Sequence, residues 1–123
     1  MSIRVLVADD QSMVRAGFRM LLGGEADIEV VAEASNGLEA VDRFQELAPD
    51  LVTMDIVMPF KSGIEATREI VKLKPGATII MCSALGQESL VMEAIEAGAS
   101  DFIVKPFKAE DVLQVVKKVL GDA

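Results

Sequence analysis

The feature that most constrains the fold is a fivefold alternation between short apolar runs and longer segments with helical periodicity. The apolar runs cover residues 3–8, 28–33, 51–55, 78–82 and 101–104. Runs of four to eight apolar or β-branched residues bounded by turn-forming residues predict buried strands. Five strand–helix units in 123 residues predict one α/β domain, residues 1–123, whose parallel sheet is covered by helices on both faces.

The segments between these runs carry apolar residues at helical spacing. The first, residues 12–22, ends at a Gly-Gly pair, and the second starts at Asn36 with Glu39 three residues later, a capping-box pattern. Gly98 and Gly121 are predicted to end the fourth and fifth helices. The residues expected to face the core are Val14, Phe18, Leu21 and Leu22; Val41, Phe44 and Leu47; Ala66, Ile70 and Leu73; Leu90, Val91, Ala94 and Ile95; and Val112, Val116, Val119 and Leu120.

The order of the strands follows from charge and connection rules. The second run carries Glu29 and Glu33, which an edge strand tolerates and a central strand rarely does. Right-handed crossovers leave few topologies, and an edge position favours the order 2-1-3-4-5 of a flavodoxin-like, three-layer α/β/α sandwich. Ligands of such sheets bind at the carboxyl ends of the first and third strands, where the strand order reverses.

Polar side chains follow the predicted strands at these ends. Asp9 and Asp10 follow the first strand, Asp55 ends the third, Ser83 follows the fourth and Lys105 follows the fifth. Any one of them alone could be an ordinary turn or cap residue. Because the carboxyl ends of parallel strands share one edge of the sheet, we expect all of them to converge.

Three converging carboxylates imply either that one of them stays protonated or that a positive charge neutralises the cluster. Two like charges about 4 Å apart repel by roughly 4 kcal/mol at an effective dielectric near 20, and Lys105 alone does not balance three. A hard divalent ion is the expected complement; Mg²⁺ fits better than Ca²⁺, and zinc would require Cys or His ligands. Such a site favours phosphoryl transfer, with Asp55 as the nucleophile, Lys105 neutralising the phosphoryl oxygens and Ser83 donating a hydrogen bond.

Composition excludes several other functions. The net charge of −8 without a basic stripe argues against direct nucleic-acid binding. The absence of histidine excludes a His-based triad, a His metal site and a phosphohistidine on this chain. No apolar run approaches the roughly 20 residues of a membrane span, and a single cysteine, Cys82, fits a reducing cytoplasm. We therefore expect a cytoplasmic protein with no membrane contact.

The combination of Asp9-Asp10, Met-Asp-Ile-Val-Met-Pro around Asp55, Ser83-Ala84 and Lys105-Pro106-Phe107 resembles the receiver domain of bacterial two-component response regulators. Residues 82–87 and 101–107 are similar to the stand-alone chemotaxis (CheY-like) type, whereas residues 11–19 and 28–34 look more like receivers of DNA-binding transcription regulators. A natural mosaic, a chimera or a consensus-type sequence is one hypothesis for this difference.

The resemblance implies a role for each residue of the set. Asp55 would accept a phosphoryl group from a sensor histidine kinase. Lys105 would form a salt bridge with that phosphoryl group, and the Lys105–Pro106 peptide bond would be cis. Mg²⁺ would be bound directly by Asp10 and Asp55, by Asp9 largely through water, and by the backbone carbonyl of Val57. The protein would then be a signalling switch, not an enzyme acting on other molecules, and would catalyse only its own phosphorylation and slow dephosphorylation.

The resemblance also implies how the signal leaves the site. Ser83 and Phe102 match the family's switch pair, through which the fourth helix, fifth strand and last helix would change and bind a target protein. That target would be a flagellar motor switch component or, as a second choice, a phosphorelay partner. Val57 and Leu85 occupy positions that influence the hydrolytic water, and their apolar side chains predict slow loss of phosphate. We expect a monomer.

The residues leave three other functions open. A phosphatase with an aspartyl nucleophile commonly has a second aspartate two residues later, where this chain has Val57. A flavin-binding electron carrier shares the strand order but needs a phosphate-cradling loop and a stacking Trp or Tyr, and this chain has neither aromatic residue. A non-phosphorylated scaffold is the third.

Overall fold

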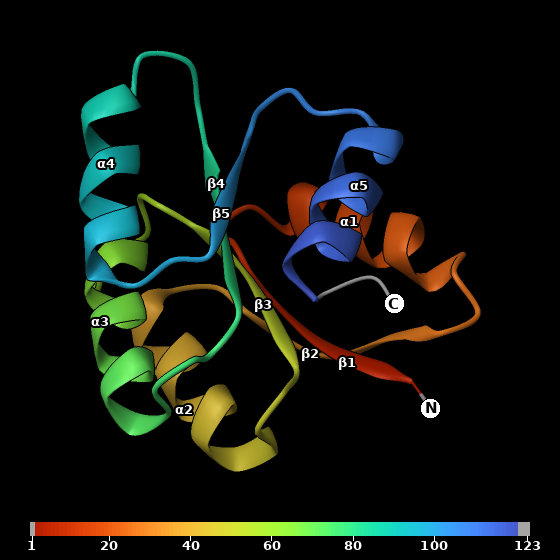
Figure 1. Cartoon of the computed structure of the whole chain (residues 1–123), viewed down its shortest axis with the longest axis horizontal. Coiled ribbons are helices and arrows are strands. Elements are labelled where there is room, and N and C mark those ends of the chain that lie inside the picture. The colour runs from red at the N-terminus through yellow and green to blue at the C-terminus, as the bar shows by residue number, and fades with distance from the viewer. Residues whose placement is uncertain (1, 121–123) are drawn as a thin grey trace.

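Five strands and five helices alternate along the chain (Figure 1). The computed structural model describes residues 2–120, so the predicted stop at Gly121 lies outside the described residues. The strands are β1 (Ile3–Ala8), β2 (Ile28–Ala34), β3 (Leu51–Asp55), β4 (Ile79–Ser83) and β5 (Asp101–Val104). The helices are α1 (Ser12–Gly23), α2 (Gly37–Leu47), α3 (Gly63–Leu73), α4 (Glu88–Ala97) and α5 (Ala109–Val119).

The strands form one parallel sheet in the order β2-β1-β3-β4-β5, which confirms the predicted topology. The central strand β3 is buried along its length until its last residue, where Asp55 emerges. At the edge, β2 is only partly buried, and its Glu29 is exposed. The charged second strand was therefore correctly assigned to the edge of the sheet.

Helices cover both faces of the sheet (Figure 1). On one face α1 and α5 contribute Phe18, Leu22, Val112 and Val116 to a core shared with alternate residues of the strands. On the other face α2, α3 and α4 bury a second core that includes Phe44, Ile70 and Ala94. The result is the predicted three-layer α/β/α sandwich, with two hydrophobic cores separated by the sheet.

The structure differs from the predicted elements in several details. β4 runs one residue further than expected, so Ser83 is its last residue and not the residue after it. Leu73 and Ile95, predicted to face the core, are instead 51% and 40% exposed; Leu73 is the last residue of α3, and Ile95 lies in the last turn of α4. None of the helices in residues 2–120 combines the length and the apolar character that crossing a membrane requires.

The helix caps also differ from the predicted pattern. Asn36 accepts a hydrogen bond from the backbone N–H of Glu39 as expected, but the Glu39 carboxylate reaches back to Ser35, not to Asn36. A reciprocal capping box instead begins α3, where Ser62 and Glu65 satisfy each other's backbone N–H groups. That box follows the Ser-x-x-Glu pattern and was missed in the sequence.

Candidate functional site

The carboxyl ends of β1 and β3 bring three carboxylates together. Asp9 and Asp10 follow β1, and Asp55 ends β3, which pairs with β1 through Ala8 and Met54. One carboxylate oxygen from each aspartate lies within 4.8 Å of the other two. The predicted acidic cluster is therefore present, and adjacent strands hold it in place.

Lys105 enters the cluster from the loop that follows β5. Its ammonium lies 2.9 Å from Asp9 Oδ2 and 3.5 Å from Asp55 Oδ1, so it bridges the two carboxylates. The Lys105–Pro106 peptide bond is cis, as the family resemblance implies. The next residue, Phe107, packs its ring against Phe18 of α1 with 4.9 Å between the ring centres, which fixes this loop to the helix layer.

Burial and like charges act together on Asp55. Its side chain is only 13% exposed. Loss of hydration is the larger cause and repulsion from Asp9 the second; together they raise the pKa of Asp55 from 3.8 to about 6. The nearby Lys105 ammonium only partly offsets this rise in pKa. Burial also disfavours the charge on Lys105, but the hydrogen bond to Asp9 and the attraction of both carboxylates raise its pKa above the ordinary value. The lone ammonium does not neutralise the cluster.

At two points the backbone of the loop after Asp55 passes so close to another segment that only glycine fits there. A Cβ on Gly63 would lie 1.9 Å from the backbone carbonyl oxygen of Asp55, and one on Gly37 would lie 2.1 Å from that of Lys61. The N–H of Gly63 also donates to Ile56, 2.8 Å away. The first turn of α3 therefore packs directly against the backbone that carries Asp55.

The cluster fits a hard divalent cation. Its donors are carboxylate oxygens, the ligands that Mg²⁺ and Ca²⁺ prefer, and the uncompensated charge on Asp55 shows that a further positive charge would be stabilising. Both oxygens of Asp9 already accept hydrogen bonds, one from the Gln11 N–H at 2.9 Å and one from Lys105, whereas Asp10 is exposed. Val57 lies two residues beyond Asp55, and the role predicted for its carbonyl stays a prediction.

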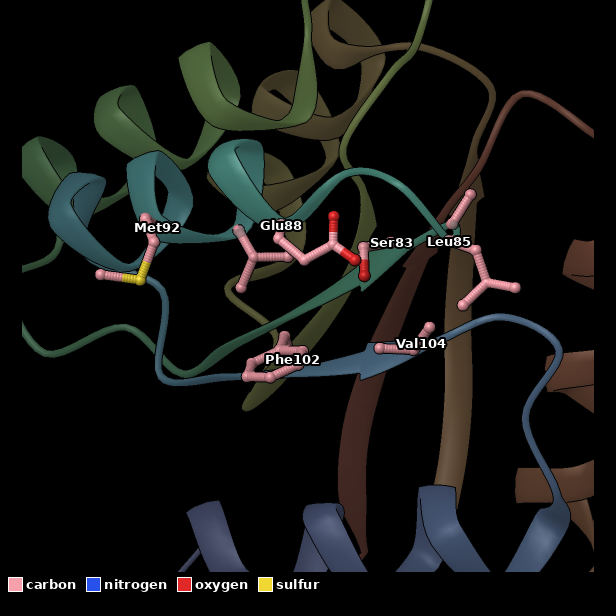
Figure 2. A pocket seen from close by; sticks show the side chains of 8 residues that line it. Ser83, Leu85, Glu88, Met92, Phe102 and Val104 are labelled. Carbon is pink, nitrogen blue, oxygen red and sulfur yellow. The ribbon is translucent and has the colours of Figure 1, made fainter.

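The two residues of the predicted switch pair face the same groove. This groove of about 260 Å³ lies between α4 and β5 and is lined by Ser83, Ala84, Leu85, Glu88, Val91, Met92, Phe102 and Val104. Figure 2 shows Ser83 and Phe102 on neighbouring strands, which form one wall of the groove, and Glu88 and Met92 of α4, which line its opposite wall. Ser83 is 1% exposed, and Phe102, with 40% of its surface exposed, lies at the mouth of the groove.

Two other predicted residues lie on the rim of the site. Val57 and Leu85, which were expected to tune dephosphorylation, are 55% and 78% exposed. Each follows the end of a strand that contributes to the site, β3 and β4 respectively. Their exposure is compatible with contact to solvent water or to a docked protein.

One residue that touches the site was not predicted. Arg15 of α1 donates from Nη1 to the backbone carbonyl of Asp9 at 2.7 Å and from Nε to Glu33 at 3.0 Å. In the sequence Glu33 served to place its strand at the edge of the sheet, and Arg15 belonged only to a segment that resembles receivers of transcription regulators. Their opposite charges on a helix and its neighbouring edge strand were the available signal.

Comparison with known proteins agrees with this geometry. Residues 5–117 match the family described as response regulator receiver domain. The chain is 50% identical over 119 residues to chemotaxis protein CheY of Thermotoga maritima, which covers 97% of this chain and 98% of that protein. It is 51% identical over 121 residues to chemotaxis protein CheY of Bacillus subtilis, covering 98% and 100% of the two chains.

A solved structure shares the fold over most of the chain. The CheX–CheY–BeF₃–Mg²⁺ complex of Borrelia burgdorferi contains a chain that superimposes with a TM-score of 0.90 at 35% identity, covering 96% of this chain and 89% of that one. The sheet order and the helix layers described above are therefore those of a solved protein that is 35% identical to this chain.

Proposed function

The chain belongs to the response regulator receiver family, and on that premise we propose that it is a stand-alone chemotaxis-type switch phosphorylated on Asp55. The observation that carries this proposal is the position of Asp55: a mostly buried carboxylate at the end of the central strand, within 4.8 Å of two further carboxylates and 3.5 Å from an ammonium. The chain also spans nearly the whole length of the two chemotaxis relatives.

The proposed donor is the phosphohistidine of a sensor histidine kinase. A carboxylate oxygen of Asp55 attacks phosphorus, the P–O bond forms as the P–N bond breaks, and the imidazole of the kinase leaves. With a pKa of about 6, Asp55 is mostly ionised at neutral pH and so available as a nucleophile. Because this chain has no histidine, the imidazole must come from the partner.

Lys105 and the acidic cluster supply the charge balance for this transfer. The ammonium of Lys105 lies between Asp9 and Asp55, within reach of an oxygen attached to Asp55. Asp10 and Asp55 would hold Mg²⁺ directly, Asp9 through water and Val57 through its carbonyl. When bound, the ion neutralises negative charge on the phosphoryl oxygens and on the carboxylates. Outside this transfer and slow hydrolysis we propose no reaction on other molecules.

The output surface is the face formed by α4, β5 and α5. Ser83 lies beside Cys82, which pairs with Asp55 across the sheet, and it also lines the groove that Phe102 enters from β5. A phosphoryl group adds about 1.5 to 2 negative charges, which is enough to reorient a nearby hydroxyl and the groove behind it. The target is a flagellar motor switch component, with a phosphorelay partner as the alternative.

NMR with Mg²⁺ and beryllofluoride, a phosphoryl analogue, tests this proposal. We expect amide shifts at residues 9, 10 and 55 and also along the α4–β5 groove in the wild type. Asp55→Asn should abolish both sets of shifts, whereas Asp42→Asn, an exposed aspartate on α2, should leave both unchanged. Shifts that persist in Asp55→Asn, or that never reach the groove, would contradict the proposal.

A further inference from the structure

Arg15 connects the acidic cluster to the edge of the sheet. Its guanidinium donates through Nη1 to the backbone carbonyl of Asp9 at 2.7 Å and through Nε to Glu33 Oε1 at 3.0 Å. The side chain is only 18% exposed. A planar guanidinium holds two acceptors in fixed directions, so this contact fixes the Asp9 carbonyl relative to β2.

That carbonyl belongs to the peptide unit between the first two aspartates of the site. Because the peptide unit is planar, holding the carbonyl oxygen also fixes the plane from which Asp10 departs. Asp9 itself is held by further bonds: its N–H donates to Ala34, and its carboxylate accepts from Gln11 and Lys105. Asp10, in contrast, is exposed, and its backbone N–H belongs to the peptide plane that Arg15 holds.

Glu33 provides the anchor for Arg15. It lies on β2 opposite Val7 of β1, two residues before Asp9, and it is 33% exposed. Burial opposes its charge, but hydrogen bonds from Arg19 and Arg15 outweigh burial and lower the pKa of Glu33 below the ordinary value. Glu33 therefore stays ionised at neutral pH and keeps Arg15 in place.

Arg19 is a matched contrast on the same helix. Its Nε donates to the other carboxylate oxygen of Glu33 at 2.8 Å, and its side chain is half exposed. This hydrogen bond is to Glu33 and not to the backbone of the site. The two arginines thus share a partner and a charge, and differ in their contact with Asp9.

We propose that Arg15 is a positioning residue for the divalent-cation site, which it serves by fixing the peptide plane between Asp9 and Asp10. This inference rests on the proposed function, because it takes the acidic cluster as the site of Mg²⁺. The direction in which Mg²⁺ affinity changes on removing Arg15 is informative, because by charge alone a guanidinium near the cluster opposes cation binding. If Arg15 acts through position, its removal weakens Mg²⁺ binding; if it acts only through charge, its removal strengthens binding.

The experiment measures Mg²⁺ affinity by amide-shift titration of the wild type, Arg15→Lys, Arg15→Ala and Arg19→Ala. We expect about tenfold weaker binding in both Arg15 variants, the range found when partners that orient metal ligands are removed. Arg15→Lys keeps the charge but lacks the planar fork, so it separates position from charge and also replaces Arg15→Ala if that variant fails to fold. Arg19→Ala should bind within about twofold of wild type.

A second readout distinguishes positioning from general loss of structure. The rate of phosphorylation by acetyl phosphate should fall in Arg15→Lys at low Mg²⁺ and recover to the wild-type rate at saturating Mg²⁺. Unchanged or tighter Mg²⁺ binding in the Arg15 variants, or equal weakening in Arg19→Ala, would overturn the inference. If the wild type itself bound no Mg²⁺, the proposed function would fail first and the inference with it.

Discussion

Replacing Asp55 with asparagine should stabilise the protein in the absence of divalent ions. Burial and the neighbouring Asp9 raise the pKa of Asp55 from 3.8 to about 6. Between these values the folded state binds more protons than the unfolded state, so the free energy of unfolding falls as pH rises from about 4 to about 6. The difference corresponds to about 3 kcal/mol, all of which is lost above pH 6.

Asparagine keeps the size of the side chain and carries no charge. Asp55→Asn should therefore unfold with a free energy about 3 kcal/mol higher than wild type at pH 8, and with about half that gain at pH 5, where Asp55 is mostly protonated only in the folded state. Adding Mg²⁺ at pH 8 should reduce the difference, because the ion stabilises the wild-type carboxylates. All other titrating groups are common to both proteins, so the difference isolates Asp55.

Urea unfolding in EDTA, followed by far-UV circular dichroism because the chain has no Trp or Tyr, measures these values. Asp42→Asn, which removes an exposed aspartate of α2, serves as the control and should show no such pH-dependent gain. An Asp55→Asn variant that is no more stable than wild type at pH 8, or whose gain is equal at both pH values, would refute the reasoning.

Three further predictions follow from the same site. Gly63→Ala places a methyl group 1.9 Å from the Asp55 carbonyl oxygen, and it should lower the free energy of unfolding by about 1–3 kcal/mol in urea titrations. Lys105→Ala removes the cation that stabilises the ionised form of Asp55, so the pKa of Asp55, followed by NMR, should rise above 6. Val57→Asn combined with Leu85→Glu should speed loss of phosphate from Asp55, measured by the decay of the phosphorylated chain.

Each of these predictions has its own check. Gly17→Ala is the control for Gly63→Ala, because a Cβ at Gly17 would have no neighbour within 4 Å; equal effects of the two substitutions would contradict the close-approach explanation. A pKa of Asp55 that is unchanged or lower in Lys105→Ala would show that Lys105 does not stabilise the ionised carboxylate. An unchanged decay rate in the double variant would remove Val57 and Leu85 from the control of dephosphorylation.

The fold was predictable because local pattern and connection rules agree. The apolar runs fixed where the strands lie, and the charges of Glu29 and Glu33 placed one of them at the edge, which is where β2 is found. With the topology given, the convergence of Asp9, Asp10 and Asp55 followed from strand direction alone. The mosaic hypothesis for the N-terminal half stays a prediction, which separate scoring of the two halves would test.

The details that escaped prediction depend on distances across the fold. No sequence pattern shows that Lys105 lies nearer to Asp9 than to Asp55, or that the backbone of α3 touches the Asp55 carbonyl. The raised pKa of Asp55 likewise depends on how deeply the folded chain buries it. Arg15 was missed because its contact with the site is to a backbone carbonyl, so that only its charge, opposite to that of Glu33, pointed to a partner.

The most direct test of the central claim is phosphorylation itself. The purified chain is incubated with acetyl phosphate and Mg²⁺, and the intact mass and the modified peptide are determined by mass spectrometry. We predict the addition of one phosphoryl group, located on Asp55, dependent on Mg²⁺ and absent from Asp55→Asn. No addition to the wild type, or an addition that persists in Asp55→Asn, would contradict the account of this protein as an aspartate-phosphorylated switch.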